Sequence, residues 1–373
     1  MQSNKKPLIL EICEFSAGIC GVWQRVKQES IELVKLGYEV HIFSSNAAKG
    51  SNEIAPPFEE IEGLKIKRFP YKKLGGESFM SWNFEKELLE LKPQVIIAHA
   101  YRHLHTTQAL KIAKKINSKI FLVTHAPFVE DGSTRSFAGK MSVMFYDRFV
   151  GPKTLNKFDK VIAITQWEIP YLLDLGVKEE NIVYIPNGIP NEFFRGKIKE
   201  FKGKKIMFFG RISPIKNIEV LIDAFKKLHN PDIALEIVGP VEQGYEDIKK
   251  FESQNITLSP PIYSLNDKIK KINESDIFVL PSKREAMPQS LIEAMALGKI
   301  VISSSTDGGK EILSDKKNGF LFEINNSEQL SGIFEYCLNK KNTKKINILK
   351  KNARKKAEEF KWGVLIKQLE KLF

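Results

Sequence analysis

The chain has 373 residues, of which 42% are hydrophobic and 28% are charged, and its formal net charge is +13. This length exceeds what one hydrophobic core usually serves, so we expect two domains. Three cysteines without metal-ligand spacing argue against a disulfide scaffold and favour a reducing, cytoplasmic setting. No window approaches the roughly 18 uncharged apolar residues of a membrane-spanning helix, so any membrane contact would be made from the surface.

The positive charge is concentrated near the end of the chain. Residues 340–373 contain twelve Lys and Arg residues against three Asp and Glu residues, a surplus of nine charges. We interpret this stretch as the solvated face of a helix; peripheral contact with the inner face of an anionic membrane is the alternative. A nucleic-acid partner is not expected, because no recognition motif appears. The charge still leaves open one non-enzymatic class, a protein that only docks this tail on a membrane or a nucleic acid.

Strand-like runs alternate with amphipathic helical runs along most of the chain. This alternation predicts α/β structure with parallel sheets covered by helices on both faces. In the first half, strands are expected at 8–13, 38–45, 93–100 and 119–126, with helices at 22–36 and 106–116. In the second half, strands are expected at 204–211, 234–240, 256–260, 276–282 and 299–305, with helices at 217–228, 244–251 and 288–297.

The chain therefore reads as two doubly wound, Rossmann-like domains facing a central cleft. Pro186, Asn187, Gly188 and Pro190 crowd into five residues and break any regular element, so the boundary is placed between domains 1–188 and 189–357. Ligands of open α/β sheets bind outside the carboxyl ends of the strands, which makes the cleft the expected site.

Two acids, Glu285 and Glu293, stand eight positions apart around the start of the predicted helix 288–297. At 100° per residue Glu293 points away from the apolar face of that helix, toward either solvent or the cleft. Carboxylates so placed can accept hydrogen bonds from a sugar and a ribose whose phosphate lies at the helix N-terminus. From spacing alone, the plainer interpretation is that Glu285 is an ordinary loop acid and Glu293 a solvated helix acid.

The stretch 284–313 carries a family resemblance. It reads REAMPQSLIEAMALGKIVISSSTDGGKEIL and resembles the E-x7-E signature of glycosyltransferase family 4, retaining enzymes of the GT-B fold that use nucleotide-sugar donors. The resemblance implies that Glu285 contacts donor-sugar hydroxyls as a catalytic, orienting residue, and that Glu293 contacts the ribose. Ala286, Met287 and Pro288 would complete the donor site, with Ala286 standing where many members carry Gly.

Two further motifs point to donor phosphates. Arg211 and Lys216 flank a turn that opens a helix, where two fixed cations can clamp a diphosphate. As isolated residues they would be solvated loop charges, but they resemble the family's Gly-Arg-x4-Lys motif, which holds the leaving diphosphate. Gly18 and Gly21 lie between the first strand and the first helix and resemble the family's glycine-rich loop. They do not form the G-x-G-x-x-G fingerprint, which argues against a nicotinamide-dependent oxidoreductase.

Two histidines come at strand ends of the first domain. His125 resembles the family histidine beside the transferred sugar and is predicted to be catalytic, whereas His99 is interpreted as structural. Asn187 and Gly188 match the family's Pro-Asn-Gly turn and are predicted as hinge and support.

The end of the chain resembles the family's closing Phe-x-Trp helix. Residues 358–373 would cross back onto the first domain, with Phe360 and Trp362 as packing anchors.

We thus expect a retaining, metal-independent glycosyltransferase that moves a sugar from a nucleoside-diphosphate sugar to an unidentified glycan, lipid or small-molecule acceptor. No cofactor or metal is implied, because no Asp-x-Asp motif is present. An epimerase or a phosphorylase of the same fold is the alternative. Acceptor specificity is expected to lie in 45–90 and 128–150, where the aromatic-rich 136–151 is predicted as a buried helix, with an acceptor groove or lipid contact as alternatives.

Overall fold

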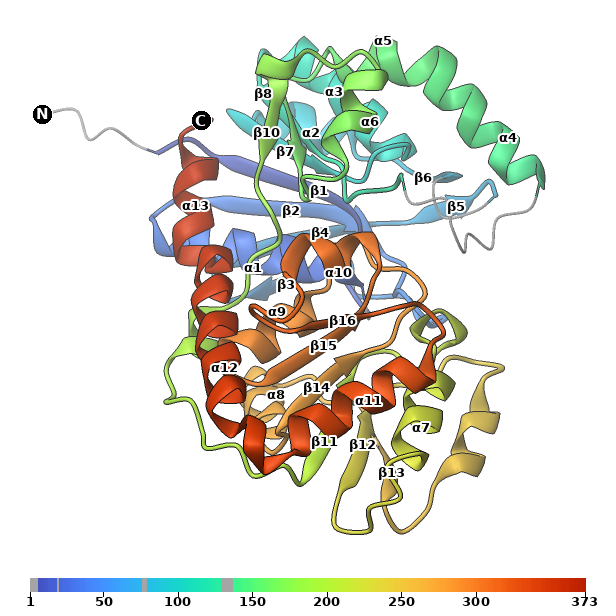
Figure 1. Ribbon diagram of the computed structural model, residues 1–373. Coiled ribbons are helices and arrows are strands. Elements are labelled where there is room, and N and C mark those ends of the chain that lie inside the picture. Colours follow the sequence, from blue (N-terminus) through green and yellow to red (C-terminus); the bar gives the residue numbers. More distant parts are fainter. Residues whose placement is uncertain (1–5, 19, 76–78, 129–136) are drawn as a thin grey trace, which may run out of the picture. The chain divides into compact units, whose positions relative to one another are not determined.

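The computed structural model describes residues 6–18, 20–75, 79–128 and 137–373. The chain forms two compact units (Figure 1). The first contains the described residues up to Gly188 together with Trp362–Phe373, and the second contains Ile189–Lys361. Each unit is built around one sheet, as the alternation of strands and helices predicts.

The first unit contains an eight-stranded sheet in the order β10-β9-β8-β7-β1-β2-β4-β3. All neighbouring strands are parallel except β3 and β4. Every residue of β1 is buried, as expected for a central parallel strand covered on both faces. The strands are β1 (Ile9–Phe15), β2 (Val40–Ser45), β3 (Phe58–Ile61), β4 (Leu64–Phe69), β7 (Val95–His99), β8 (Lys119–Val123), β9 (Lys160–Ala163) and β10 (Ile182–Tyr184).

Amphipathic helices cover this sheet. In α1 (Gly21–Lys35), Trp23, Val26 and Leu33 are buried on one face, and Gly37 then takes a left-handed φ of 88° that ends the helical run. A hairpin of β5 (Tyr71–Lys73) and β6 (Met80–Trp82) lies apart from the main sheet. The other helices are α2 (Glu85–Leu91), α3 (Leu104–Lys115), α4 (Phe137–Phe145), the π-helix Tyr146–Val150, α5 (Gly151–Leu155), α6 (Ile169–Asp174) and α13 (Trp362–Glu370).

The second unit contains a fully parallel six-stranded sheet in the order β13-β12-β11-β14-β15-β16. One predicted helix is wrong: 244–251 forms a shorter 3₁₀ helix, Glu246–Phe251, and Gly244 lies outside it because its φ of 84° is left-handed. The strands are β11 (Lys205–Phe209), β12 (Ala234–Val238), β13 (Ile256–Ser259), β14 (Ile277–Leu280), β15 (Ile300–Ser304) and β16 (Phe320–Phe322). The helices are α7 (Ile218–Lys226), α8 (Leu265–Ile272), α9 (Gln289–Ala296), α10 (Asp307–Ile312), α11 (Ser327–Leu338) and α12 (Thr343–Ala357).

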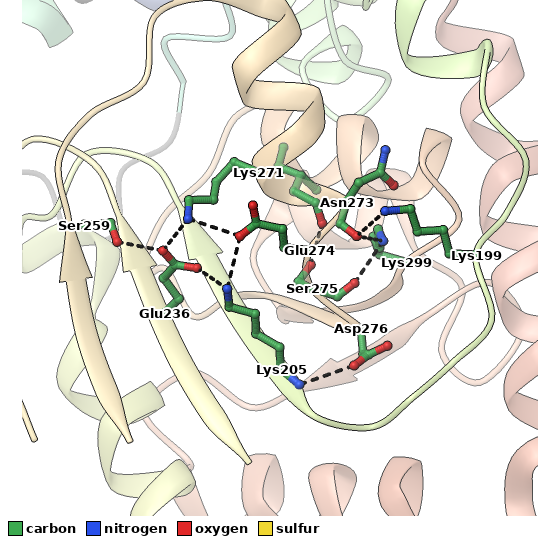
Figure 2. Close-up of polar contacts among 11 residues, drawn as sticks. Lys199, Lys205, Glu236, Ser259, Lys271, Asn273, Glu274, Ser275, Asp276 and Lys299 are labelled. Atoms are coloured by element: carbon green, nitrogen blue, oxygen red, sulfur yellow. Dashed lines mark hydrogen bonds and ion pairs between the residues drawn. The ribbon is translucent and has the colours of Figure 1, made fainter. Parts of the chain in front are cut away.

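A network of charges joins the amino ends of these strands (Figure 2). Glu236 pairs with Lys205 at 2.7 Å and with Lys271 at 2.8 Å. Lys299 donates to two backbone carbonyls, and burial lowers its pKa to about 8. Asp276 accepts from three backbone N–H groups, those of Lys202, Lys204 and Lys205. These bonds tie the strands together at the edge opposite the predicted site, beside a cavity of about 650 Å³.

The apolar stretch in α4 and the π-helix is not a buried helix. Met144, Phe145 and Phe149 are exposed, Phe145 by 61%. The stretch carries apolar side chains on more than one side, and only one side can face the core, where Tyr146 packs. None of the helices in the described residues is long and apolar enough to cross a membrane.

The basic stretch near the end of the chain forms α12. Ile346, Leu349 and Ala353 are buried along one face of this helix, while Lys344 and Lys351 lie on its exposed face. This arrangement agrees with the interpretation of the tail as a solvated helical face.

The chain returns to the first unit at Trp362. Glu358–Phe360 is a separate 3₁₀ turn, and extended backbone at Lys361 prevents a continuous helix, so the predicted helix 358–373 begins only at Trp362. Trp362 is 1% exposed, and its Nε1 donates to Gln28 Oε1 at 2.9 Å. A Cβ atom on Gly188 would lie 2.5 Å from the Trp362 ring, so only glycine fits beneath it.

This contact predicts that Gly188→Ala destabilises the first unit by about 1–3 kcal/mol, because the added methyl overpacks a buried ring. All four tryptophans, Trp23, Trp82, Trp167 and Trp362, lie in the first unit, so tryptophan fluorescence during denaturation follows that unit. Gly21→Ala is the matched control, because no described atom lies within 4 Å of a Cβ at Gly21. Equal stability of the two variants would contradict the prediction.

Candidate functional site

Lys216 and Glu285 meet at the carboxyl end of the second sheet. Lys216 ends a 3₁₀ turn after β11, and Glu285 lies in the loop after β14. Lys216 Nζ is 2.6 Å from Glu285 Oε1, and Ser282 Oγ donates to the same oxygen at 2.6 Å. Because β11 and β14 pair in parallel, their two loops leave the sheet at the same edge. The structure thus joins two residues predicted from separate motifs.

Backbone contacts hold these two loops in place. Lys283 N–H donates to the Ile215 carbonyl at 2.9 Å, and Asn217 Nδ2 donates to the Pro281 carbonyl at 3.2 Å. Asn217 reaches this position with a left-handed φ of 56°. Lys216 lies between these two anchor points, so its ammonium is held near Glu285 by the backbone as well as by charge.

The loop after Glu285 packs against the start of α10. Gly308 N–H donates to the Glu285 carbonyl at 3.1 Å, and a Cβ on Gly308 would lie 2.6 Å from the Ala286 carbonyl oxygen. Met287 and Pro288 are buried, and α9 begins directly after Pro288. The close backbone approach at this loop is therefore provided by Gly308, although Ala286 occupies the position that is often glycine in the family.

Glu293 is buried within the second unit. Its two carboxylate oxygens lie 2.6 and 2.7 Å from Lys268 Nζ on α8, and this ammonium also lies over the Phe209 ring. The alternative in which Glu293 faces solvent is therefore wrong. Burial raises the pKa of Glu293, and Lys268 opposes that rise. Glu285 is paired with Lys216, and Glu293 is paired with a different lysine, Lys268. Lys268 was not predicted from the sequence because it belongs to no motif.

Arg211 is not part of the Lys216–Glu285 cluster. Its side chain is 51% exposed and pairs with Glu242 at 3.2 Å. An exposed pair of this kind contributes little stability and exchanges partners easily. The two cations of the predicted clamp therefore follow the same strand but have separate acidic partners.

A chain of buried polar side chains leads away from His125 in the first unit. His125 Nε2 lies 3.0 Å from His99 Nδ1, and His99 Nε2 lies 2.6 Å from Glu11 Oε2. Burial lowers the pKa of His99 to about 3 and that of His125 well below its ordinary value, so both rings are neutral. Burial raises the pKa of Glu11 to about 8. His99, interpreted from the sequence as structural, is thus the direct partner of His125.

The direction of the hydrogen bonds from Glu11 to His125 depends on whether Glu11 is protonated. A protonated Glu11 donates to His99, which then donates to His125 Nε2; an ionised Glu11 instead makes His99 accept from His125. The protonation state of Glu11 therefore decides which nitrogen of His125 carries the proton.

Glu168 supports the turn that carries His125. His125 and Ala126 have left-handed φ values of 61° and 48°. Glu168 Oε2 lies 2.6 Å from Thr124 Oγ1, and Oε1 accepts from the N–H of Ile164 at 2.5 Å. Burial raises the pKa of Glu168 to about 7. No pattern in the sequence pointed to Glu168, which lies 43 positions from His125 in the chain.

The predicted hinge residue Asn187 is bound by a buried arginine. Arg25 Nη1 donates to Asn187 Oδ1 and to the Ile185 carbonyl, both at 3.0 Å, and Arg25 Nη2 lies 2.9 Å from Glu29 Oε2. Burial raises the pKa of Glu29 to about 7. Asn187 thus ties the end of the first sheet to α1.

The two glycines of the predicted loop have different surroundings. Gly18 has a φ of 77°, and a Cβ there would lie 2.2 Å from the Lys49 carbonyl oxygen. The close packing against Lys49 is therefore enough by itself to require glycine at this position. Gly21 begins α1. The part of Gly18 and Gly21 in binding a diphosphate stays a prediction.

Comparison with known proteins decides the family. A model described as Glycosyltransferase Family 4 matches residues 19–193, and one described as Glycosyl transferases group 1 matches residues 190–356. The chain belongs to glycosyltransferase family 4. The predictions of an enzyme and of this family are therefore confirmed.

The glycosyltransferase resembles other proteins along most of its length. An uncharacterised glycosyltransferase of Methanocaldococcus jannaschii is 28% identical, with 90% of each chain covered. The UDP-Gal:alpha-D-GlcNAc-diphosphoundecaprenol alpha-1,3-galactosyltransferase of Escherichia coli is 30% identical over 54% of each chain. A crystal structure of a Rickettsia africae glycosyltransferase has a TM-score of 0.78 at 19% identity, covering 98% of each chain. Anabaena HepE, in complex with UDP and glucose, has a TM-score of 0.73 at 16% identity, covering 98% of this chain and 99% of the other. The structural likenesses confirm the GT-B fold.

Glu168 predicts a pH dependence of stability. Its folded pKa is raised, so the stability it contributes is present below its ordinary pKa of 4.5 and is lost as pH rises through about 7. Between pH 5 and pH 8, the unfolding free energy of the wild type should fall by about 3 kcal/mol relative to Glu168→Gln, which cannot ionise. Denaturation followed by tryptophan fluorescence measures this difference; a constant difference across the range would contradict it.

Proposed function

We propose that the protein transfers a sugar from a nucleoside-diphosphate sugar to an acceptor with retention of anomeric configuration. The contact between Lys216 and Glu285 at 2.6 Å carries this proposal. It places a cation that suits a phosphate beside a carboxylate that suits sugar hydroxyls, and both follow strands of one parallel sheet. A donor that bridges the two would replace part of the ion pair with its own contacts.

The chemistry follows from these charges. Lys216, Arg211 and the N-terminus of α9 would stabilise the leaving diphosphate, so the transfer itself needs no metal. Family resemblance points to same-face attack, in which the donor phosphate helps to take the proton from the acceptor hydroxyl. Glu285 then orients the sugar and stabilises developing positive charge, because Lys216 and Ser282 both donate hydrogen bonds to its carboxylate and fix its position. Glu293 would bind the ribose after leaving Lys268, or together with it.

The relatives suggest which substrates to try first. The E. coli relative is named for transfer from UDP-Gal to a diphosphoundecaprenol-linked sugar, and HepE was crystallised with UDP and glucose. We therefore propose a UDP-sugar as the donor and a lipid-linked sugar as the first acceptor class to test.

Lys216 and Glu285 predict separable defects. Lys216→Met should weaken UDP binding measured by calorimetry by roughly 2 kcal/mol or more, because a partly desolvated cation is lost. Glu285→Gln should retain UDP binding and lower transfer by roughly 100-fold, because the sugar is no longer oriented. Lys283→Met is the matched control, since Lys283 lies in the same loop with an exposed side chain.

Three results would overturn parts of this proposal. Unchanged UDP affinity in Lys216→Met removes the phosphate role. Near wild-type transfer by Glu285→Gln removes the sugar role. An inverted product anomer, detected by NMR, excludes retention, and a new sugar nucleotide formed without an acceptor indicates an epimerase.

We also propose that the exposed surface of α4 and the π-helix meets an anionic membrane. Met144, Phe145 and Phe149 are exposed there beside the basic residues Lys140 and Arg148. An apolar face flanked by cations is typical of helices that lie at the membrane surface. This surface lies far in sequence from the basic tail, where the sequence had suggested membrane contact.

The two surfaces can be told apart by vesicle flotation. Met144→Ser with Phe149→Ser should lower binding to phosphatidylglycerol-containing vesicles by about tenfold or more, because buried apolar area is lost. Lys344→Glu with Lys351→Glu on α12 is the matched control. A loss confined to the α12 variant would move the contact back to the tail. Truncating the tail is unsuitable, because Trp362 is part of the first unit.

A further inference from the structure

A second polar cluster in the first unit is separate from the His125 chain and has no part in the proposed transfer. Glu14 lies near the end of β1, and His103 and His105 lie at the start of α3. His103 Nδ1 and His105 Nδ1 are each 2.9 Å from the same oxygen, Glu14 Oε2. One ligand atom from each residue lies within 4.8 Å of the other two.

The hydrogen bond on the far side of His105 fixes its proton. His105 Nε2 lies 2.8 Å from the His99 carbonyl oxygen, which can only accept, so Nε2 carries a hydrogen. Nδ1 lies 2.9 Å from Glu14 Oε2 but makes no hydrogen bond within the described residues, so in the neutral ring its lone pair is unpartnered. A buried ring nitrogen and a carboxylate oxygen this close, with no hydrogen bond between them, need a positive charge beside them.

That positive charge is either a proton on His105 or a metal ion. A metal-bound histidine usually donates its other ring N–H to a carbonyl or carboxylate, as His105 does to His99. Glu14 and His105 are buried, and within the described part of the chain Glu14 Oε1 and His105 Nδ1 have no hydrogen-bond partner. A proton on His105 Nδ1 would lie 2.9 Å from Glu14 Oε2 without forming a hydrogen bond, and it would leave Glu14 Oε1 without a partner.

We propose that Glu14, His103 and His105 bind a divalent ion of the Zn²⁺ class. Two imidazoles and a carboxylate are ordinary zinc ligands, with bonds of about 2.0–2.2 Å. Ligand atoms bonded at that length to one tetrahedral ion lie about 3.3 Å apart. Here each imidazole nitrogen lies 2.9 Å from Glu14 Oε2, and all three ligand atoms lie within 4.8 Å of one another, so side-chain adjustments would bring them around one ion. His103 is 18% exposed, which leaves the fourth position open to water.

Such an ion would join β1 to α3 next to the His125 chain. The His99 backbone carbonyl accepts from His105, while the His99 side chain contacts His125 and Glu11. The ion would lie in the first unit, whereas the proposed diphosphate cations Arg211 and Lys216 belong to the second. The inference therefore does not rest on the proposed transfer.

The test uses the full chain without a histidine tag, stripped of metal with a chelator and titrated with Zn²⁺ by calorimetry. We expect one equivalent to bind, and His103→Gln and Glu14→Gln each to weaken binding at least about 100-fold. Co²⁺ in place of Zn²⁺ should give visible absorption bands of tetrahedral coordination, which are lost in both variants. His41→Gln is the matched control, because His41 lies 3.0 Å from Glu39 without a third ligand.

Two results would overturn the proposal. One is the absence of stoichiometric Zn²⁺ binding in a folded wild-type chain. The other is equal Zn²⁺ affinity of the wild type and His103→Gln, whose partly exposed side chain makes it the variant least harmful to folding. In either case, hydrogens on both ring nitrogens of His105, observed by nitrogen NMR, would identify the positive charge as a proton.

Discussion

A guanidinium group with no exposed surface organises the first unit. Arg25 must have charged and polar partners, because an uncompensated buried charge costs several kcal/mol. Its partners come from three places in the chain: Glu29 within α1, the segment ending at Asn187, and the Trp362 ring, whose centroid lies 5.4 Å away. Glu29 in turn adjoins Glu11 and, through it, the histidines. The segment that leads to the second unit and the segment that returns from it are thus fastened to one side chain.

The two units place functional groups by the same means. Each has parallel strands whose carboxyl ends carry short loops, and each holds its key side chain with polar partners, at least one of which is distant in sequence. Lys216 and Ser282 do this for Glu285, while His99 and Glu168 do it around His125. Left-handed backbone at Asn217 and His125 is tolerated because these surrounding bonds specify it.

The sequence predicted the fold well where the periodicity was strong. The strands β1, β2, β7 and β8 of the first sheet, the strands β11 to β15 of the second, and the helices α1, α3, α7 and α9 were expected within a few residues, because buried parallel strands are almost continuously apolar. The short strands β9, β10 and β16 were not expected. The short strands between Phe58 and Trp82 were missed because each has only three to six residues, and in β4 buried residues alternate with exposed ones. The periodicity of 244–251 also did not distinguish a 3₁₀ helix from an α-helix.

The candidate site was predictable only as far as its motifs extend. Glu285 and Lys216 stand in recognisable patterns, and the structure brings them together. Lys268, Glu168, Glu11 and Arg25 act through contacts between elements, and a single charged residue in a helix or strand gives no sign of its partner. The pairing of Arg211 with Glu242 could not be predicted from the sequence either. It joins the loops after β11 and β12, which are neighbours only because these two strands are adjacent in the sheet.

The return of the chain at Trp362 has a consequence for biosynthesis. Residues 189–361 form an insertion between two parts of the first unit. The two ends of this insertion are joined by a hydrogen bond, which Ile189 N–H donates to the Phe360 carbonyl at 2.8 Å. During translation the twelve residues Trp362–Phe373, which complete the first unit, leave the ribosome after all of 189–361. The N-terminal unit, although made first, therefore waits for the entire second unit before its last helix can pack, reversing the usual N-terminal-first order of domain completion.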